Sequence, residues 1–114
     1  MSQLTINLVQ GSVTFQCSVE AAKAIQEDLS KLIISLKAAS NSVGSGQRPQ
    51  RQESLEYRYT GDVFLELFCN PNIWPSPFAA KVLITLKDNQ IRLTTEAELT
   101  QVIEDINQYL EQNS

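Results

Sequence analysis

Apolar and polar residues alternate in two short runs at the start of the chain. Residues 4–8 alternate with leucine and isoleucine at every second position, and residues 13–17 repeat the pattern after a turn that contains Gly11. Because successive side chains of a strand point to opposite faces, this period of two predicts a β-hairpin with one face in water.

The period then changes to that of a helix. Ser18 offers an N-cap oxygen, and apolar residues follow at steps of three and four through about residue 39. A second helix is predicted near the end of the chain, where Thr95 and Glu98 have the spacing of a capping box. Its expected apolar stripe consists of Leu99, Val102, Ile103, Ile106 and Leu110.

Between the helices, four further strands and one linker are predicted. Strands at 55–60 and 63–69 flank a Gly-Asp turn, and strands at 81–86 and 91–93 flank a polar turn. Three prolines interrupt the sheet between residues 70 and 79, since proline cannot donate to a strand ladder. Residues 40–54 contain one aliphatic side chain, so we expect a flexible linker or a long loop there.

These elements predict a single α+β domain over residues 1–114, in the order ββα-ββ-ββα. We expect an antiparallel sheet of about six strands with both helices packed on one face. The first and last thirds of the chain also share their apolar pattern at an offset of 78, with a one-residue deletion before the helix. Duplication of a ββα unit explains this correspondence. The pattern shared by any amphipathic hairpin followed by an amphipathic helix explains it equally well.

Composition narrows the class of protein. The chain has 114 residues, of which 42% are hydrophobic, and a net charge of −4. This composition is too apolar and too weakly charged for a disordered chain. No stretch reaches the roughly 20 apolar residues of a membrane-spanning helix, and the first residues lack the basic start of a secretory signal. We therefore expect a cytoplasmic protein without membrane insertion, whose Cys17 and Cys69 are buried rather than bridged.

Candidate chemistry is sparse. The chain has no histidine, the residue most often used as a general base and metal ligand near neutral pH. Neither cysteine has a cationic neighbour in sequence to activate it, so we expect no catalytic residue, no metal site and no cofactor. Basic residues are few and scattered, which argues against nucleic acid as a partner.

Glu66 stands out as the one charged residue in an otherwise apolar strand. A pocket lined by Tyr57, Arg58 and Glu66 would make the chain a small-ligand-binding domain or a minor enzyme. A two-residue turn would pair Glu66 with Tyr57, whereas a register shifted by one would place the tyrosines on the aliphatic face. The pattern leaves both registers open.

The preferred hypothesis is a small non-enzymatic interaction protein. Two helices on one face leave the other face uncovered, and the 63–69 strand is apolar on both sides. We expect it to associate with itself, as a dimer, or to bind a protein partner, and a subunit or assembly factor without its own activity also fits. The candidate contact residues are Tyr57, Tyr59, Phe64, Phe68, Trp74 and Phe78. For the Trp74 loop, folding back as a lid on the sheet is the alternative.

Overall fold

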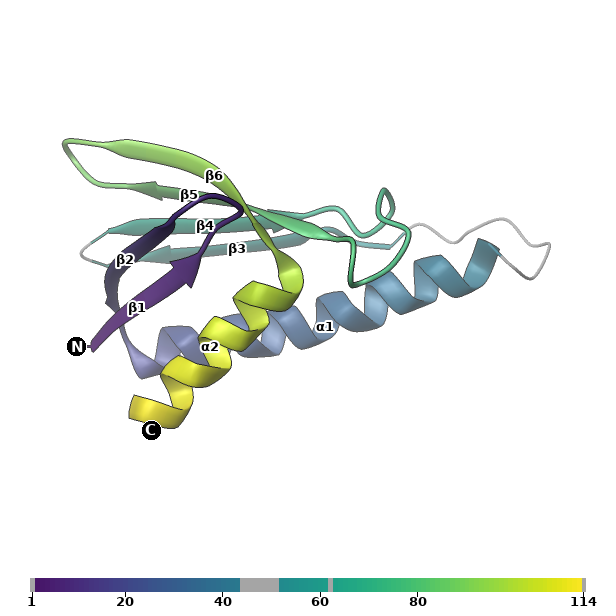
Figure 1. Cartoon of the computed structure of the whole chain (residues 1–114), viewed down its shortest axis with the longest axis horizontal. Helices are drawn as coiled ribbons and strands as arrows, with labels where there is room; N and C mark the ends of the chain where they lie inside the picture. The colour runs from purple at the N-terminus through teal and green to yellow at the C-terminus, as the bar shows by residue number, and fades with distance from the viewer. Residues whose placement is uncertain (1, 44–51, 62, 114) are drawn as a thin grey trace.

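Six strands and two helices follow one another in the order that the sequence predicts (Figure 1). The computed structural model describes residues 2–43, 52–61 and 63–113. The elements are β1 (Ser2–Asn7), β2 (Ser12–Cys17), α1 (Val19–Val43), β3 (Leu55–Thr60), β4 (Phe64–Cys69), β5 (Lys81–Lys87), β6 (Arg92–Glu98) and α2 (Leu99–Asn113). The α+β class and the antiparallel pairing of the strands are confirmed.

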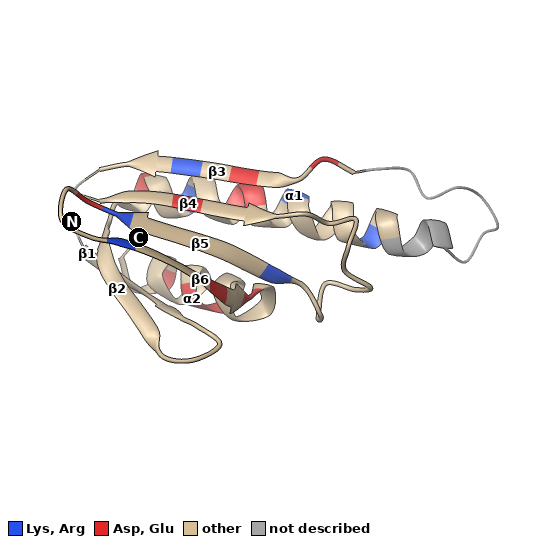
Figure 2. Cartoon of the chain, turned by 90° about the horizontal axis from the view of Figure 1, so that it is seen from above, with Lys and Arg blue, Asp and Glu red and all other residues tan. Residues whose placement is uncertain are grey.

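The prediction of one six-stranded sheet is wrong. The described strands form a two-stranded sheet, β1-β2, and a four-stranded sheet, β3-β4-β5-β6. The hairpin β1-β2 runs at an angle to the other strands (Figure 2), and one backbone hydrogen bond, from Val9 N to Glu96 O (3.3 Å), links it to β6. The outward N–H of Asn7 on β1 is bonded instead to the Asp105 carboxylate on α2, so a helix side chain takes the place of a neighbouring strand.

The first helix is longer than predicted. Its N-cap is confirmed, because the Ser18 hydroxyl accepts a hydrogen bond from Ala21 N (3.1 Å). The helix continues to Val43, so the first four residues of the expected 40–54 linker are helical. Residues 52–54 have no regular structure, and 44–51 lie outside the described residues.

The second helix begins four residues later than its predicted capping box. Thr95 lies within β6, paired with Ile84, and the helix starts at Leu99, whose backbone N–H is bonded to Ala80 O (3.0 Å). The Thr95–Glu98 spacing belongs to a strand because the pairing with β5 continues to the Lys81–Glu98 pair. Tertiary pairing therefore overrides the local helix-start signal.

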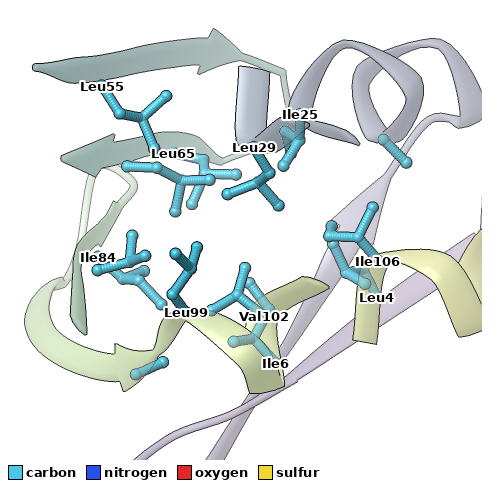
Figure 3. Packing of buried hydrophobic residues seen from close by; sticks show 14 of the residues in the cluster. Leu4, Ile6, Ile25, Leu29, Leu55, Leu65, Ile84, Leu99, Val102 and Ile106 are labelled. Carbon is cyan, nitrogen blue, oxygen red and sulfur yellow. The ribbon is translucent and has the colours of Figure 1, made fainter. Parts of the chain in front are cut away.

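Both helices lie on the same side of the four-stranded sheet (Figure 1). The core fills the space between them and the sheet, where Leu65 and Ile84 point toward Leu29 of α1 and Leu99 of α2 (Figure 3). Ile6 of β1 belongs to the same cluster, so the small hairpin closes the core from the side. No described helix has the length and apolar character needed to cross a membrane.

The two ββα units correspond at an offset of 80, not at the predicted 78. The hairpin-closing pairs are Asn7–Ser12 and Lys87–Arg92, and the helices begin at Val19 and Leu99. The turns share a hydrogen bond at equivalent positions, from Leu8 N to Gly11 O (2.9 Å) and from Asp88 N to Ile91 O (3.0 Å). At this offset no deletion is needed, because the turn length and the strand-to-helix junction are the same in both units.

Candidate interaction surface

One face of the four-stranded sheet carries no described helix (Figure 1). Along β4 the side chains of Leu65, Leu67 and Cys69 are buried toward the helices, whereas Phe64, Glu66 and Phe68 alternate with them and remain partly exposed. We call this side the open face. It consists of Glu56, Arg58, Thr60, Phe64, Glu66, Phe68, Lys81, Leu83, Thr85, Lys87, Arg92, Thr94, Glu96 and Glu98.

Strand register arranges most of these side chains in three rows across the sheet. The acidic row is Glu56–Phe68–Leu83–Glu96, the middle row is Arg58–Glu66–Thr85–Thr94, and the basic row is Thr60–Phe64–Lys87–Arg92. Each row runs from β3 to β6, because residues paired across an antiparallel sheet lie side by side on the same face. A fourth, shorter row, Lys81–Glu98, lies beyond the acidic row. The charged groups of the basic row are therefore cations, whereas the opposite end of the open face holds Glu56, Glu96 and Glu98 together with Lys81.

Arg58, Glu66 and Lys87 each have a partner on the open face. Arg58 Nε donates to Glu66 Oε2 at 2.7 Å, and this hydrogen bond raises the pKa of Arg58. Lys87 Nζ lies 4.8 Å from the centroid of the Phe64 ring, within range of a cation–π contact. The apolar side chains of the open face remain partly in contact with water. Leu83 is 40% exposed, and its neighbour Phe68 is partly exposed.

Tyr57 and Tyr59 lie on the opposite face from Phe64 and Phe68. The register pairs Arg58 with Glu66 and Tyr57 with Leu67, which selects the second of the two registers that the sequence leaves open. Both tyrosines pack against the core, and the Tyr57 hydroxyl donates to Ala21 O of α1 (3.4 Å). Burial raises the pKa of Tyr57. Of the six predicted contact residues, these two therefore face the helices.

The same register separates the residues of the alternative ligand pocket. Arg58 and Glu66 form an ion pair on the open face, while Tyr57 points to the helix side of β3. An exposed ion pair of this kind is common on sheet surfaces and contributes little free energy. The three side chains do not converge on one ligand.

The loop between β4 and β5 divides its two aromatic residues between core and solvent. Trp74 is half-buried against the core and hydrogen-bonded through its side chain to Cys69, so it folds back toward the sheet as the lid alternative expects of Trp74 and Phe78 together. Phe78 retains 84% of its exposure, and Ile73 retains 67%. Both exposed residues belong to the connection at the acidic-row end of the open face. Cys17 and Cys69 are buried and free, as predicted.

Sequence reasoning missed the contribution of the last two strands to this surface. The sequence pattern places Leu83 in a strand, Lys87 in a turn and Glu96 at the start of the second helix, not on one shared surface. A signal was available at Leu83, because a leucine between the inward-pointing Val82 and Ile84 places an apolar side chain on the outer face.

A hollow of about 750 Å³ lies between α1 and α2. Ile33, Ile103 and Leu110 line it together with the charged Lys23 and Glu27. Among the described residues no three His, Cys, Asp or Glu side chains gather as a metal site would require. The hollow therefore has a mixed lining of apolar and polar side chains, without a cluster of metal-binding groups among the described residues.

Comparison with known proteins adds no relative to these observations. No family model, no curated protein and no solved structure matches the chain.

Proposed function

We propose that this chain is a non-catalytic interaction protein that binds a protein partner through the open face. The observation that carries the proposal is the apolar centre formed by Phe64, Phe68 and Leu83, which stays partly in water on a sheet side without a described helix. Burying the exposed part of each of these side chains in an interface contributes about 1 kcal/mol of favourable binding free energy. Three such side chains favour a partner over solvent.

The arrangement of polarity supports the same function. Protein interfaces have an apolar centre enriched in aromatic residues and a polar rim. On the open face Phe68 and Leu83 are the inner pair of their row, and Glu56 and Glu96 are its outer members. The exposed Phe78 of the β4–β5 loop extends the apolar area beyond the sheet.

The protein partner is favoured over a small ligand because the open face is a broad sheet surface. Small-molecule sites are concave and gather a few polar groups around one volume. Here the two polar residues of the candidate pocket, Arg58 and Glu66, bond to each other at 2.7 Å. They supply a neutral polar patch beside the apolar centre.

The test compares two exposed apolar sites. Tagged wild type, Phe68→Ser and Ile34→Ser are incubated with lysate of the source cells and with an untagged copy of the chain, and bound protein is quantified. Ile34 is the matched control, because it is 68% exposed on α1, away from the open face. Circular dichroism confirms that all three are folded.

The expected result is selective. Phe68→Ser lowers recovery of the bound protein by about tenfold or more, as for a residue at the centre of an interface, while Ile34→Ser binds as wild type. Equal recovery by wild type and Phe68→Ser would show that the open face is not the binding surface.

A further inference from the structure

Resting on the proposed function, we infer that the partner is a second copy of this chain, packed open face to open face about a twofold axis that runs across the strands. A symmetric dimer requires a surface that is complementary to itself. The open face meets that requirement in its charges and in its apolar centre.

The charges of the open face differ between its two ends, with Lys81 as the one cation among the carboxylates at the acidic end. Glu56 and Glu96 end the acidic row, and Lys87 and Arg92 end the basic row, next to the β5–β6 turn (Figure 2). Glu96 and Arg92 are both exposed, and neither has an ion pair with another described residue. Four residues apart on one strand, they are separated by about 13 Å, too far to pair within the chain.

Two aligned arrangements of the faces are available to a twofold dimer. An axis along the strands stacks each row on the same row, so Glu56 faces Glu96 of the second copy. An axis across the strands, through the middle row, stacks the acidic row on the basic row, and Glu96 then faces Arg92 of the second copy. Opposite charges meet twice in this second arrangement, which electrostatics therefore selects.

The same operation also matches the apolar residues. Phe68 faces Phe64 of the second copy, and symmetry repeats the contact, so four aromatic rings gather near the axis. Leu83 faces the aliphatic stem of Lys87, whose charged end already lies over the Phe64 ring. Arg58 faces Arg58 of the second copy. The ion pair of each Arg58 with Glu66 in its own chain reduces the repulsion between the two guanidinium groups.

Charge exchange tests the orientation. Wild type, Glu96→Arg, Arg92→Glu, the double variant with both changes, and the control Glu104→Arg are compared by sedimentation equilibrium at low salt. Glu104 is an exposed carboxylate on α2, so its reversal alters the net charge by the same amount away from the open face. Each change on the open face acts at two symmetric contacts.

Wild type is expected to be a dimer, and Glu104→Arg to match it. Each single reversal places like charges together and raises the dimer Kd about tenfold or more, with a smaller effect in high salt. The double variant restores opposite charges at both contacts and returns the Kd to within about threefold of wild type. Single variants that dimerise as wild type does, or a double variant no better than either, overturn the inferred dimer.

The outcome also separates this inference from the function on which it rests. A wild-type chain that stays monomeric at about 0.5 mM, yet captures another protein in a way that Phe68→Ser abolishes, overturns the dimer and retains the interaction surface. If Phe68→Ser changes neither self-association nor the capture of another protein, both the inferred dimer and the proposed interaction surface are overturned.

Discussion

Asp105 on α2 holds the end of β1 through two hydrogen bonds from Asn7. Its carboxylate accepts one from the Asn7 backbone nitrogen at 2.8 Å and one from the Asn7 side-chain amide at 3.0 Å. The side-chain amide of Gln101 donates a third at 2.9 Å, and Asp105 is only 5% exposed. A carboxylate in the stripe of α2 that packs on the hairpin is therefore the polar link between the small sheet and the helix.

Replacing Asp105 by alanine is expected to lower the free energy of unfolding by about 2 kcal/mol. The change leaves a backbone N–H and an amide without their acceptor in a part-buried position. Urea denaturation measures the loss. The control is Glu104→Ala, which removes the neighbouring exposed carboxylate and should change stability by less than about 0.5 kcal/mol. Equal losses in the two variants would contradict the role given to Asp105.

Two tyrosine hydroxyls allow a second comparison. Tyr109 is buried and donates to Cys17 O, while Tyr57 is half-buried and donates to Ala21 O over 3.4 Å. Tyr109→Phe is expected to cost about 1 kcal/mol of unfolding free energy, because it removes a hydrogen bond made in the buried core. Tyr57→Phe should cost less than half as much, since long hydrogen bonds are weak. Thermal or urea unfolding gives both values, and the reverse order would refute the assignment.

Local patterns predicted the elements of this fold well. The alternation at residues 4–8 and 13–17 and the N-cap at Ser18 appear in the structure at or near their expected positions. They succeed because each depends on residues close in sequence. The Thr95–Glu98 motif failed because β5 recruits residues 92–98 as a partner strand, and a local motif carries no information about that pairing.

Relations between distant segments were not predictable from the pattern alone. The Asn7–Asp105 hydrogen bond beside the smaller sheet joins residues 98 apart in sequence, and the offset of 80 emerges only from strand register. The open face follows the same logic. The sequence identifies Phe64 and Phe68 as surface candidates because they break the polar alternation. The side of the sheet on which Tyr57 lies follows only from the register between β3 and β4.

The buried thiol of Cys69 predicts a loss of stability at alkaline pH. Burial raises the pKa of Cys69 to about 11, while the side chain of Trp74 partly offsets the shift. In the unfolded chain the thiol titrates near its ordinary value of 9.0, so between that pH and 11 the native state holds more protons than the unfolded state. The free energy of unfolding therefore falls as pH rises, and Cys69 should account for about 2 kcal/mol by pH 10.5.

Urea titrations from pH 8 to 10.5 measure this slope in wild type and in Cys69→Ala. The variant removes the titrating group, so its stability should decline less steeply even if its value at pH 8 is lower. A residual slope is expected, since burial also raises the pKa values of Cys17 and Tyr57. If the free energy of unfolding falls equally steeply with pH in both proteins, Cys69 does not cause the loss of stability at alkaline pH.

The two equivalent turns make a final prediction about backbone conformation. Gly11 has φ of +91°, whereas Ile91, at the corresponding position 80 residues later, is not among the residues with positive φ. A Cβ at Gly11 would meet no atom within 4 Å, so the cost of Gly11→Ala comes from the backbone alone. We expect a loss of about 1 kcal/mol in unfolding free energy, and a smaller loss for Gly11→Asn, because asparagine tolerates positive φ better.

Ile91→Gly should not stabilise its turn, because the position does not need the freedom that glycine gives and the unfolded chain gains entropy. Urea unfolding of the three variants and of Gln10→Ala, an exposed neighbour in the first turn, completes the comparison. Amide exchange at Leu8 reports on the turn directly, since Leu8 N is bonded to Gly11 O at 2.9 Å. It should accelerate in Gly11→Ala relative to Gln10→Ala, and unchanged exchange and stability would show that the turn does not require a left-handed residue.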